Sequence, residues 1–187
     1  LGFLNDIEPV GDFIGKFNKF PVIGKTEDIN KFLSDEEVLF FVAYVGMQKE
    51  EEVFMKINSL NIPSNRFATL IHPTSIIPKG FCKIGNGVLI APLAQLSTDT
   101  TLEDNCMMLA NSFLGHDSVM RKFAHIASNA VVGANVDVGR AVHIGTNATI
   151  IEKIRIGDFS LVGTGSVVLN DVEDNSIVVG NPARLLR

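Results

Sequence analysis

The sequence predicts a mainly β fold, in which a small α/β unit precedes a parallel β-helix, and two observations support this prediction. Residues 74–169 repeat a six-residue pattern without an insertion, whereas residues 1–73 alternate apolar runs with amphipathic stretches. The 187 residues are 46% hydrophobic and 20% charged, a composition typical of folded globular domains. We therefore expect two domains, residues 1–73 and residues 74–187.

The six-residue repeat is defined by one apolar position. Every sixth residue from Ile84 to Val168 is Ile, Leu, Val or Met, and the residue two positions earlier is small or β-branched. Because side chains alternate across a strand, both positions face inward and the residue between them faces outward. The other three residues must turn a corner, where Gly or Asn tolerates a positive φ. Three strands and three corners close a triangular coil, and successive coils stack about 4.8 Å apart.

The first 73 residues show the alternation of strands and helices that is typical of a Rossmann-like unit with a parallel sheet. Extended segments are expected at 2–4, 21–24, 38–45 and 67–71, and helices at 26–34 and 48–60. Thr26 is the expected N-cap of the first helix. Val38–Val45 is continuously apolar, as expected for a parallel strand that is covered on both faces.

Charge and cysteine content exclude several classes of protein. A net charge of -5 disfavours nucleic acid as a partner, since phosphate binding needs clustered Lys and Arg. Cys82 and Cys106 cannot form a disulfide framework or a Cys/His zinc pattern, so we expect a reducing, cytoplasmic location. The chain shows neither a signal peptide nor an apolar run long enough to span a bilayer.

One corner carries a candidate catalytic pair. His116 follows Gly115 in a predicted corner, and Asp117 follows His116. A carboxylate beside an imidazole sets its tautomer and raises its basicity, which suits a general base. The alternative is a solvated corner histidine without a catalytic role.

The repeat resembles the left-handed β-helix of hexapeptide-repeat acyltransferases over residues 74–169, and the left hand is implied by this resemblance. Gly115-His116-Asp117, followed by Phe123-Ala124-His125, resembles the sialic acid O-acetyltransferase and UDP-4-amino-sugar N-acetyltransferase family. The resemblance implies that His116 is the catalytic base, that Asp117 raises its basicity, and that His125 contacts acetyl-CoA.

Two further segments resemble the same family. Val179–Arg184 resembles the Gly-x-Pro-Ala-Lys/Arg ending near the CoA-binding edge. The resemblance also implies a pantetheine site at backbone groups of the predicted corners, namely Gly145, Thr146, Gly163 and Thr164. As an alternative, these four residues are simply turns.

The first unit also resembles the family, in which it binds the nucleotide of a UDP-sugar. Gly2-Phe3-Leu4-Asn5-Asp6 matches a Gly-Phe-Leu-Asp-Asp segment, so Asn5 and Asp6 are candidate substrate ligands together with Gly46. The sequence departs from the family in two places. The first strand and its glycine-rich turn are missing, and Gly-Asn-Asn is replaced by Gly46-Met47-Gln48.

His125 and His143 are 18 residues apart and should stack on one face, and a stacked pair of histidines raises the possibility of a metal site. The γ-class carbonic anhydrases share the β-helix and bind zinc through three histidines, two of them close in sequence. This chain has no such close pair, so we expect no metal. Cys82 and Cys106 occupy inward positions and should be inert.

Together these features predict an acetyl-CoA-dependent acetyltransferase that acts on a nucleotide-linked amino sugar in bacterial glycan synthesis. O-acetylation of a sugar or sialic acid and a non-catalytic β-helix scaffold are the alternatives. His116 lies at a corner and His125 on another face, so one subunit cannot readily bring both to one reaction centre. We therefore expect a homotrimer with active sites between its subunits.

Overall fold

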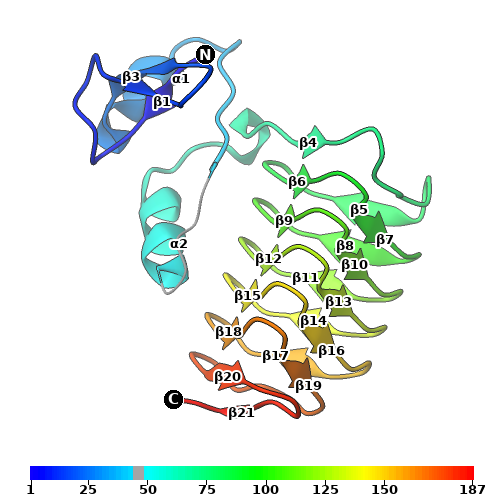
Figure 1. Ribbon diagram of the computed structural model, residues 1–187. Helices are drawn as coiled ribbons and strands as arrows, with labels where there is room; N and C mark the ends of the chain where they lie inside the picture. Colours follow the sequence, from blue (N-terminus) through cyan, green and yellow to red (C-terminus); the bar gives the residue numbers. More distant parts are fainter. Residues whose placement is uncertain (44–48) are drawn as a thin grey trace.

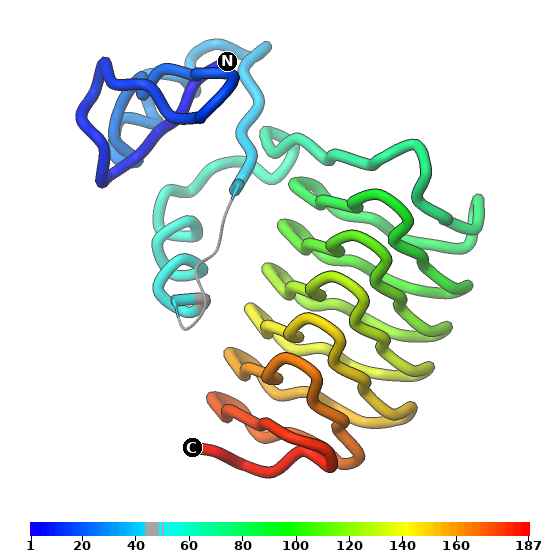
Figure 2. The backbone as a smooth tube through the Cα atoms, in the orientation of Figure 1, coloured from blue at the N-terminus to red at the C-terminus, as the bar shows by residue number. Residues whose placement is uncertain are grey.

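The protein, in a computed structural model that describes residues 1–43 and 49–187, consists of a small N-terminal unit and a regular parallel β-helix (Figure 1). The backbone trace in Figure 2 shows successive triangular coils stacked from residue 70 to the C-terminus. A helix of the N-terminal part, α2 (Glu50–Ser59), lies beside this stack.

Three sheets form the sides of the β-helix. The first sheet contains β4 (Leu70–Ile71), β6 (Leu89–Ile90), β9 (Met107–Met108), β12 (His125–Ile126), β15 (His143–Ile144), β18 (Leu161–Val162), β20 (Ile177–Val179) and β21 (Arg184–Leu185). The second contains β7 (Gln95–Leu96), β10 (Phe113–Leu114), β13 (Val131–Val132), β16 (Thr149–Ile150) and β19 (Val167–Val168). The third contains β5 (Cys82–Ile84), β8 (Thr100–Leu102), β11 (Val119–Met120), β14 (Asp137–Val138) and β17 (Arg155–Ile156).

Neighbouring strands in each sheet are parallel, apart from the antiparallel pair β20 and β21. Their register follows the repeat, because Phe113 pairs with Val131 and His125 with His143, 18 residues or three hexads apart. The predicted β-helix is therefore confirmed. Its core is the inward aliphatic column, which is buried at every predicted position except Ile84, where the first coil leaves the column half-buried.

The corners follow the same six-residue period as the strands. One residue in each hexad has a positive φ, from Gly87 (φ +71°) to Gly165 (φ +68°). Asn fits this conformation easily and occupies the predicted corners at Asn105, Asn111, Asn129, Asn135 and Asn147. The same backbone conformation also occurs at corners with other residues, so it is imposed by the stacking of coils.

The N-terminal unit contains a three-stranded sheet and short helices. Its elements are β1 (Phe3–Leu4), β2 (Phe13–Ile14), β3 (Phe20–Gly24), η1 (Thr26–Ile29) and α1 (Asn30–Leu33), and η2 (Ser64–Arg66) follows α2. The sheet order is β1-β3-β2, with β1 parallel and β2 antiparallel to β3. The extended segments at 2–4 and 21–24 and the helical segment at 26–34 are confirmed.

Two predictions for the N-terminal unit are wrong in detail. The N-cap of η1 is Lys25 rather than Thr26, because Asp28 accepts the Lys25 amide at 2.8 Å while the Thr26 hydroxyl binds Asp6. The second concerns the strand predicted at 38–45. Within its described part, 38–43, only an isolated bridge from Phe40 to Phe67 forms, because an apolar run becomes a strand only beside a partner strand, and the β1-β3-β2 sheet does not extend to it.

The predicted strand at 67–71 is reduced to β4, which pairs with β6 in the first sheet of the β-helix. The predicted helix at 48–60 is present as α2. Across residues 1–43 and 49–187, no helix combines the length and apolar character needed to cross a membrane.

Candidate active site

His116 lies at the corner that joins β10 in the second sheet to β11 in the third. Its Nδ1 is 2.6 Å from Oδ2 of Asp117, and both side chains are about half exposed. Asp117 occupies the positive-φ position of the corner (φ +58°), which turns its carboxylate back toward the imidazole. A proton held on Nδ1 by the carboxylate leaves Nε2 free to accept a proton from a substrate.

The coil above and the coil below hold this corner in place. The His116 carbonyl accepts the amide of Asn135 at 2.8 Å, and the amide of Asp117 donates to the Thr98 carbonyl at 3.1 Å. The fully buried hydroxyl of Ser118 donates to the Gly133 carbonyl at 3.1 Å and accepts the amide of Val136 at 3.0 Å. These hydrogen bonds to neighbouring coils hold the backbone of His116, and therefore its imidazole, in place.

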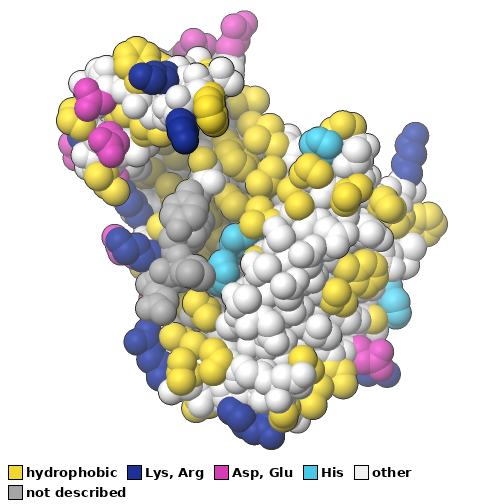
Figure 3. Space-filling model, in the orientation of Figure 1, with side chains coloured by type: hydrophobic (Ala, Val, Ile, Leu, Met, Phe, Trp, Pro, Cys, Tyr) yellow, Lys and Arg dark blue, Asp and Glu magenta, His cyan; other side chains and the backbone are white. Residues whose placement is uncertain are grey.

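His125 and His143 are adjacent in the first sheet, and their rings meet edge to face with centroids 4.7 Å apart. Burial, with a smaller contribution from His143, lowers the pKa of His125 to about 4, and burial also lowers the pKa of His143. Nε2 of His125 is buried without a hydrogen-bond partner among the described residues. On the face shown in Figure 3, histidine side chains lie in the hollow beside the β-helix.

The pKa of His125 predicts a loss of stability in acid. The unfolded imidazole binds a proton below its ordinary pKa of 6.5, whereas the folded one stays neutral down to about pH 4. The free energy of unfolding should therefore fall between pH 6.5 and 4, by at most about 3 kcal/mol from this residue. Urea unfolding at pH 7.5 and 4.5 measures this loss.

A matched pair of variants distinguishes the contribution of His125 to acid destabilisation from the effect of low pH on the rest of the protein. His125→Phe should lose less stability in acid than the parent, because its ring cannot bind a proton. His72→Ala, which removes an exposed histidine bonded to Thr74, is the control for loss of a histidine outside the buried pair. An unchanged slope in His125→Phe would rule out this explanation.

Metal ligands and reactive thiols were tested against the same geometry. Across the described ranges, 1–43 and 49–187, no group of three or more His, Cys, Asp or Glu side chains is placed to hold a metal ion. Burial raises the pKa of the Cys106 thiol, and Cys82 is half-buried beside Thr100. The thiol of Cys106 therefore stays protonated inside the core.

The structure does not bring His116 and His125 together within one chain. His116 stands at the corner between the second and third sheets, whereas His125 lies in the first sheet, which closes the opposite side of the triangle.

The four residues of the predicted pantetheine site, Gly145, Thr146, Gly163 and Thr164, lie at the corner between the first and second sheets. A Cβ at Gly145 would lie 2.7 Å from the Thr164 amide, and one at Gly163 would lie 2.7 Å from the Val179 side chain. Thr146 accepts the Gly165 amide at 2.8 Å, and Thr164 is exposed. Close stacking of coils thus requires Gly145, where the Cβ would meet backbone, while Gly163 packs against a side chain and Thr164 is accessible.

The predicted substrate residues serve the local structure of the N-terminal unit. Oδ1 of Asn5 accepts the amides of Ile7 and Glu8. Asp6 accepts hydrogen bonds from Lys56 and from the amide and hydroxyl of Thr26, and these lower the pKa of its carboxyl to about 2. Gly46 lies outside the described residues.

One contact was missed by reasoning from sequence. Phe54 of α2 packs against Phe123 and Phe159, which lie two coils apart. A signal for it was present in the sequence, since phenylalanine occupies two corners where Asn or Gly is usual.

No protein-family model and no curated protein matches the chain. Among solved structures, the acetyltransferase domain of PglB from Neisseria gonorrhoeae FA1090 is 27% identical, with a TM-score of 0.81 over 99% of this chain and 86% of that one. The same domain in complex with acetyl coenzyme A is 28% identical, with a TM-score of 0.80 over 99% and 85%. The predicted resemblance to hexapeptide-repeat sugar acetyltransferases is confirmed.

Other hexapeptide-repeat sugar acetyltransferases share the fold at lower identity. Perosamine N-acetyltransferase from Caulobacter crescentus, a histidine-to-asparagine mutant in complex with CoA and GDP-perosamine, is 20% identical, with a TM-score of 0.79 over 90% of this chain and 78% of that one. WeeI from Acinetobacter baumannii AYE is 23% identical, with a TM-score of 0.74 over 92% and 81%.

Proposed function

We propose that the protein transfers the acetyl group of acetyl-CoA to the amino group of a nucleotide-linked sugar in bacterial glycan synthesis. The observation that carries this proposal is the contact between His116 and Asp117 at an exposed corner of the β-helix. Support comes from the 28% identical acetyltransferase domain in complex with acetyl coenzyme A and from the perosamine N-acetyltransferase fold.

The chemistry assigned to His116 is proton removal. The sugar amine attacks the thioester carbonyl, so that a C–N bond forms while Nε2 of His116 takes a proton from the amine. Backbone N–H groups at a corner stabilise the oxyanion of the tetrahedral intermediate. Its collapse breaks the C–S bond, and the CoA thiolate leaves and takes the proton from the His116 imidazolium, which restores the neutral base. The products are the N-acetylated sugar and CoA.

The cofactor and substrate sites are further parts of the proposal. His125 and the corner residues Gly145, Thr146, Gly163 and Thr164 contact acetyl-CoA. The N-terminal unit, with Asn5 and Asp6 at the end of β1, receives the nucleotide. The coils follow the left hand of the family, and the enzyme works in the cytoplasm.

We propose a homotrimer because one chain holds His116 and His125 on opposite sides of its triangle. Packing the corner of one subunit against the first sheet of its neighbour brings both to one site. Apolar outward side chains on the second sheet, including Phe113, Val131 and Val167, support an interface between copies.

An acetyl-transfer screen tests the function. Release of the CoA thiol is measured with UDP-, dTDP- and GDP-linked 4-amino sugars, and the matching 4-hydroxy sugars test O-acetylation. We expect release that depends on an amino sugar and disappears in His116→Ala. Binding of acetyl-CoA without transfer to any acceptor would instead favour the scaffold alternative.

A further inference from the structure

The corner between the third and first sheets carries apolar residues in three successive coils. Its positive-φ positions are occupied by Phe123 (φ +62°), Ala141 (φ +50°) and Phe159 (φ +58°) in three successive coils. Bulky residues rarely adopt this conformation, because the side chain crowds the backbone. Leu93 (φ +62°) and Lys153 (φ +60°) show that the stacked coils impose this conformation on other large residues too, so the conformation alone does not explain why phenylalanine occurs twice in one corner.

Phe54 of α2 supplies that explanation. Its ring centroid is 5.4 Å from that of Phe123 and 5.5 Å from that of Phe159, with both contacts edge to face. Residues two coils apart are separated by roughly 9–10 Å, which leaves room for one ring between them. The small, buried Ala141 keeps the space between the two phenylalanines open. These three corner residues form the socket of Phe54.

Arg140 reinforces the socket. Its guanidinium carbon lies 6.0 Å from the centroid of Phe54 and 5.6 Å from that of Phe159. Asp158 holds the guanidinium through bonds of 2.8 and 2.5 Å and also accepts the Arg140 amide at 2.7 Å. A fixed cation beside two aromatic rings adds attraction to their packing.

The same helix also contacts the turn that follows β1 in the N-terminal unit. Lys56, two residues after Phe54, forms an ion pair with Asp6, whose carboxylate also binds the amide and hydroxyl of Thr26. Helix α2 therefore connects the socket on the β-helix to the turn after β1 and, through Asp6, to the start of η1.

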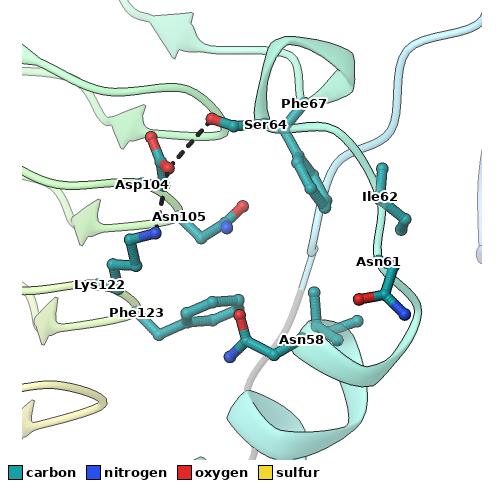
Figure 4. A pocket seen from close by; sticks show the side chains of 10 residues that line it. Asn58, Asn61, Ile62, Ser64, Phe67, Asp104, Asn105, Lys122 and Phe123 are labelled. Carbon is teal, nitrogen blue, oxygen red and sulfur yellow. Dashed lines mark hydrogen bonds and ion pairs between the residues drawn. The ribbon is translucent and has the colours of Figure 1, made fainter.

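A second, separate attachment lies at η2. Ser64 donates a hydrogen bond to Asp104 at 3.0 Å, and Arg66 donates to the carbonyl groups of Leu33, Asp35 and Val38. A cavity of about 90 Å³ lies between α2 and the corners, lined by Asn58, Asn105 and other residues shown in Figure 4. Two attachments at separate places fix an orientation, whereas one alone leaves a hinge.

We propose that Phe54 and its socket fix the orientation of the N-terminal unit on the β-helix and thereby position the nucleotide-linked sugar for acetyl transfer. Phe54 is a positioning residue, and its part in catalysis rests on the proposed function. The acetyl-CoA site, built from the β-helix, does not depend on it.

Kinetic constants test the positioning role. Phe54→Ala should raise KM for the nucleotide sugar about tenfold, while kcat and the Kd of acetyl-CoA change less than twofold. Ala141→Leu, which fills the socket without altering α2, should have the same effect. Phe54→Tyr keeps the ring and should resemble the parent. Met55→Ala, at a 61% exposed position of the same helix, is the matched control and should not change KM.

A distance measurement tests the orientation without any turnover. Spin labels at Lys31→Cys and Lys153→Cys, two exposed sites in the two parts of the chain, are placed in a Cys82→Ser background. Phe54→Ala and Ala141→Leu should broaden the distance distribution, and Met55→Ala should not. Circular dichroism melting confirms that the β-helix is folded in each variant.

The outcomes separate this proposal from the function on which it rests. Unchanged distance distributions in both variants would overturn the fixing role of Phe54. Broadened distributions with an unchanged sugar KM would overturn its positioning role. If the parent transfers acetyl to no acceptor, the proposed function fails, and the label distances still decide whether the socket holds the N-terminal unit.

Discussion

Replacing His116 with alanine is expected to reduce turnover by about 100- to 10,000-fold, the range for loss of a positioned general base. The imidazole is half exposed at a corner, and its Nδ1 is held by Asp117, so Nε2 faces solvent as the proton acceptor. The Kd of acetyl-CoA should change little, because the proposed role of His116 is to take a proton from the sugar amine, while the proposed contacts to acetyl-CoA are made by other residues. Steady-state kinetics and calorimetry measure the two effects.

Two variants control for this result. Asp117→Asn keeps the size of the side chain but removes its charge, and should cause a smaller loss of turnover than His116→Ala. His72→Ala removes an exposed histidine bonded only to Thr74 among the described residues, and should retain parental turnover. Near-parental turnover in His116→Ala would remove His116 from the reaction.

Replacing Gly115 with alanine is expected to destabilise the β-helix by about 3 kcal/mol or more, at the upper end of the range for overpacking. A Cβ at this position would lie 2.5 Å from the carbonyl carbon and oxygen of Gly133 and 2.6 Å from the Ala134 amide. All three atoms belong to the backbone of the next coil, which cannot move without breaking its ladder. Urea unfolding measures the loss, and His116, the next residue, should be displaced in any protein that folds.

Gly165→Asn is the matched control. Gly165 has a φ of +68°, and a Cβ there would meet nothing within 4 Å. Asn147 occupies the same corner one coil earlier with a φ of +58°. The control should therefore change the free energy of unfolding by less than about 0.5 kcal/mol. Equal stability of Gly115→Ala and the parent would show that the coils are not packed as closely as described.

The β-helix was predictable because its information is local and repeated. Each hexad places one aliphatic residue inward, and the register from Ile84 to Val168 confirms the pattern coil after coil. The candidate catalytic pair was equally predictable from the sequence, because His116 and Asp117 are adjacent in the chain. Their 2.6 Å contact required only that the corner turn the carboxylate back.

The N-terminal unit was less predictable, because an apolar run does not specify its partner. Val38–Val45 resembles a buried strand, yet its described part forms only the bridge from Phe40 to Phe67. Likewise, Leu70 and Ile71 form a strand by pairing with β6, so their partner belongs to the β-helix and not to the N-terminal sheet.

The sequence by itself determined the β-helix, its inward residues and the position of the candidate base, since these depend on a short period and on neighbours in the chain. Only the tertiary structure decided where α2 lies and why phenylalanine occupies two strained corners. Phe54 meets Phe123 and Phe159 across 69 and 105 residues of sequence, respectively. Contacts over such separations leave no periodic pattern in the sequence, so only the folded structure reveals them.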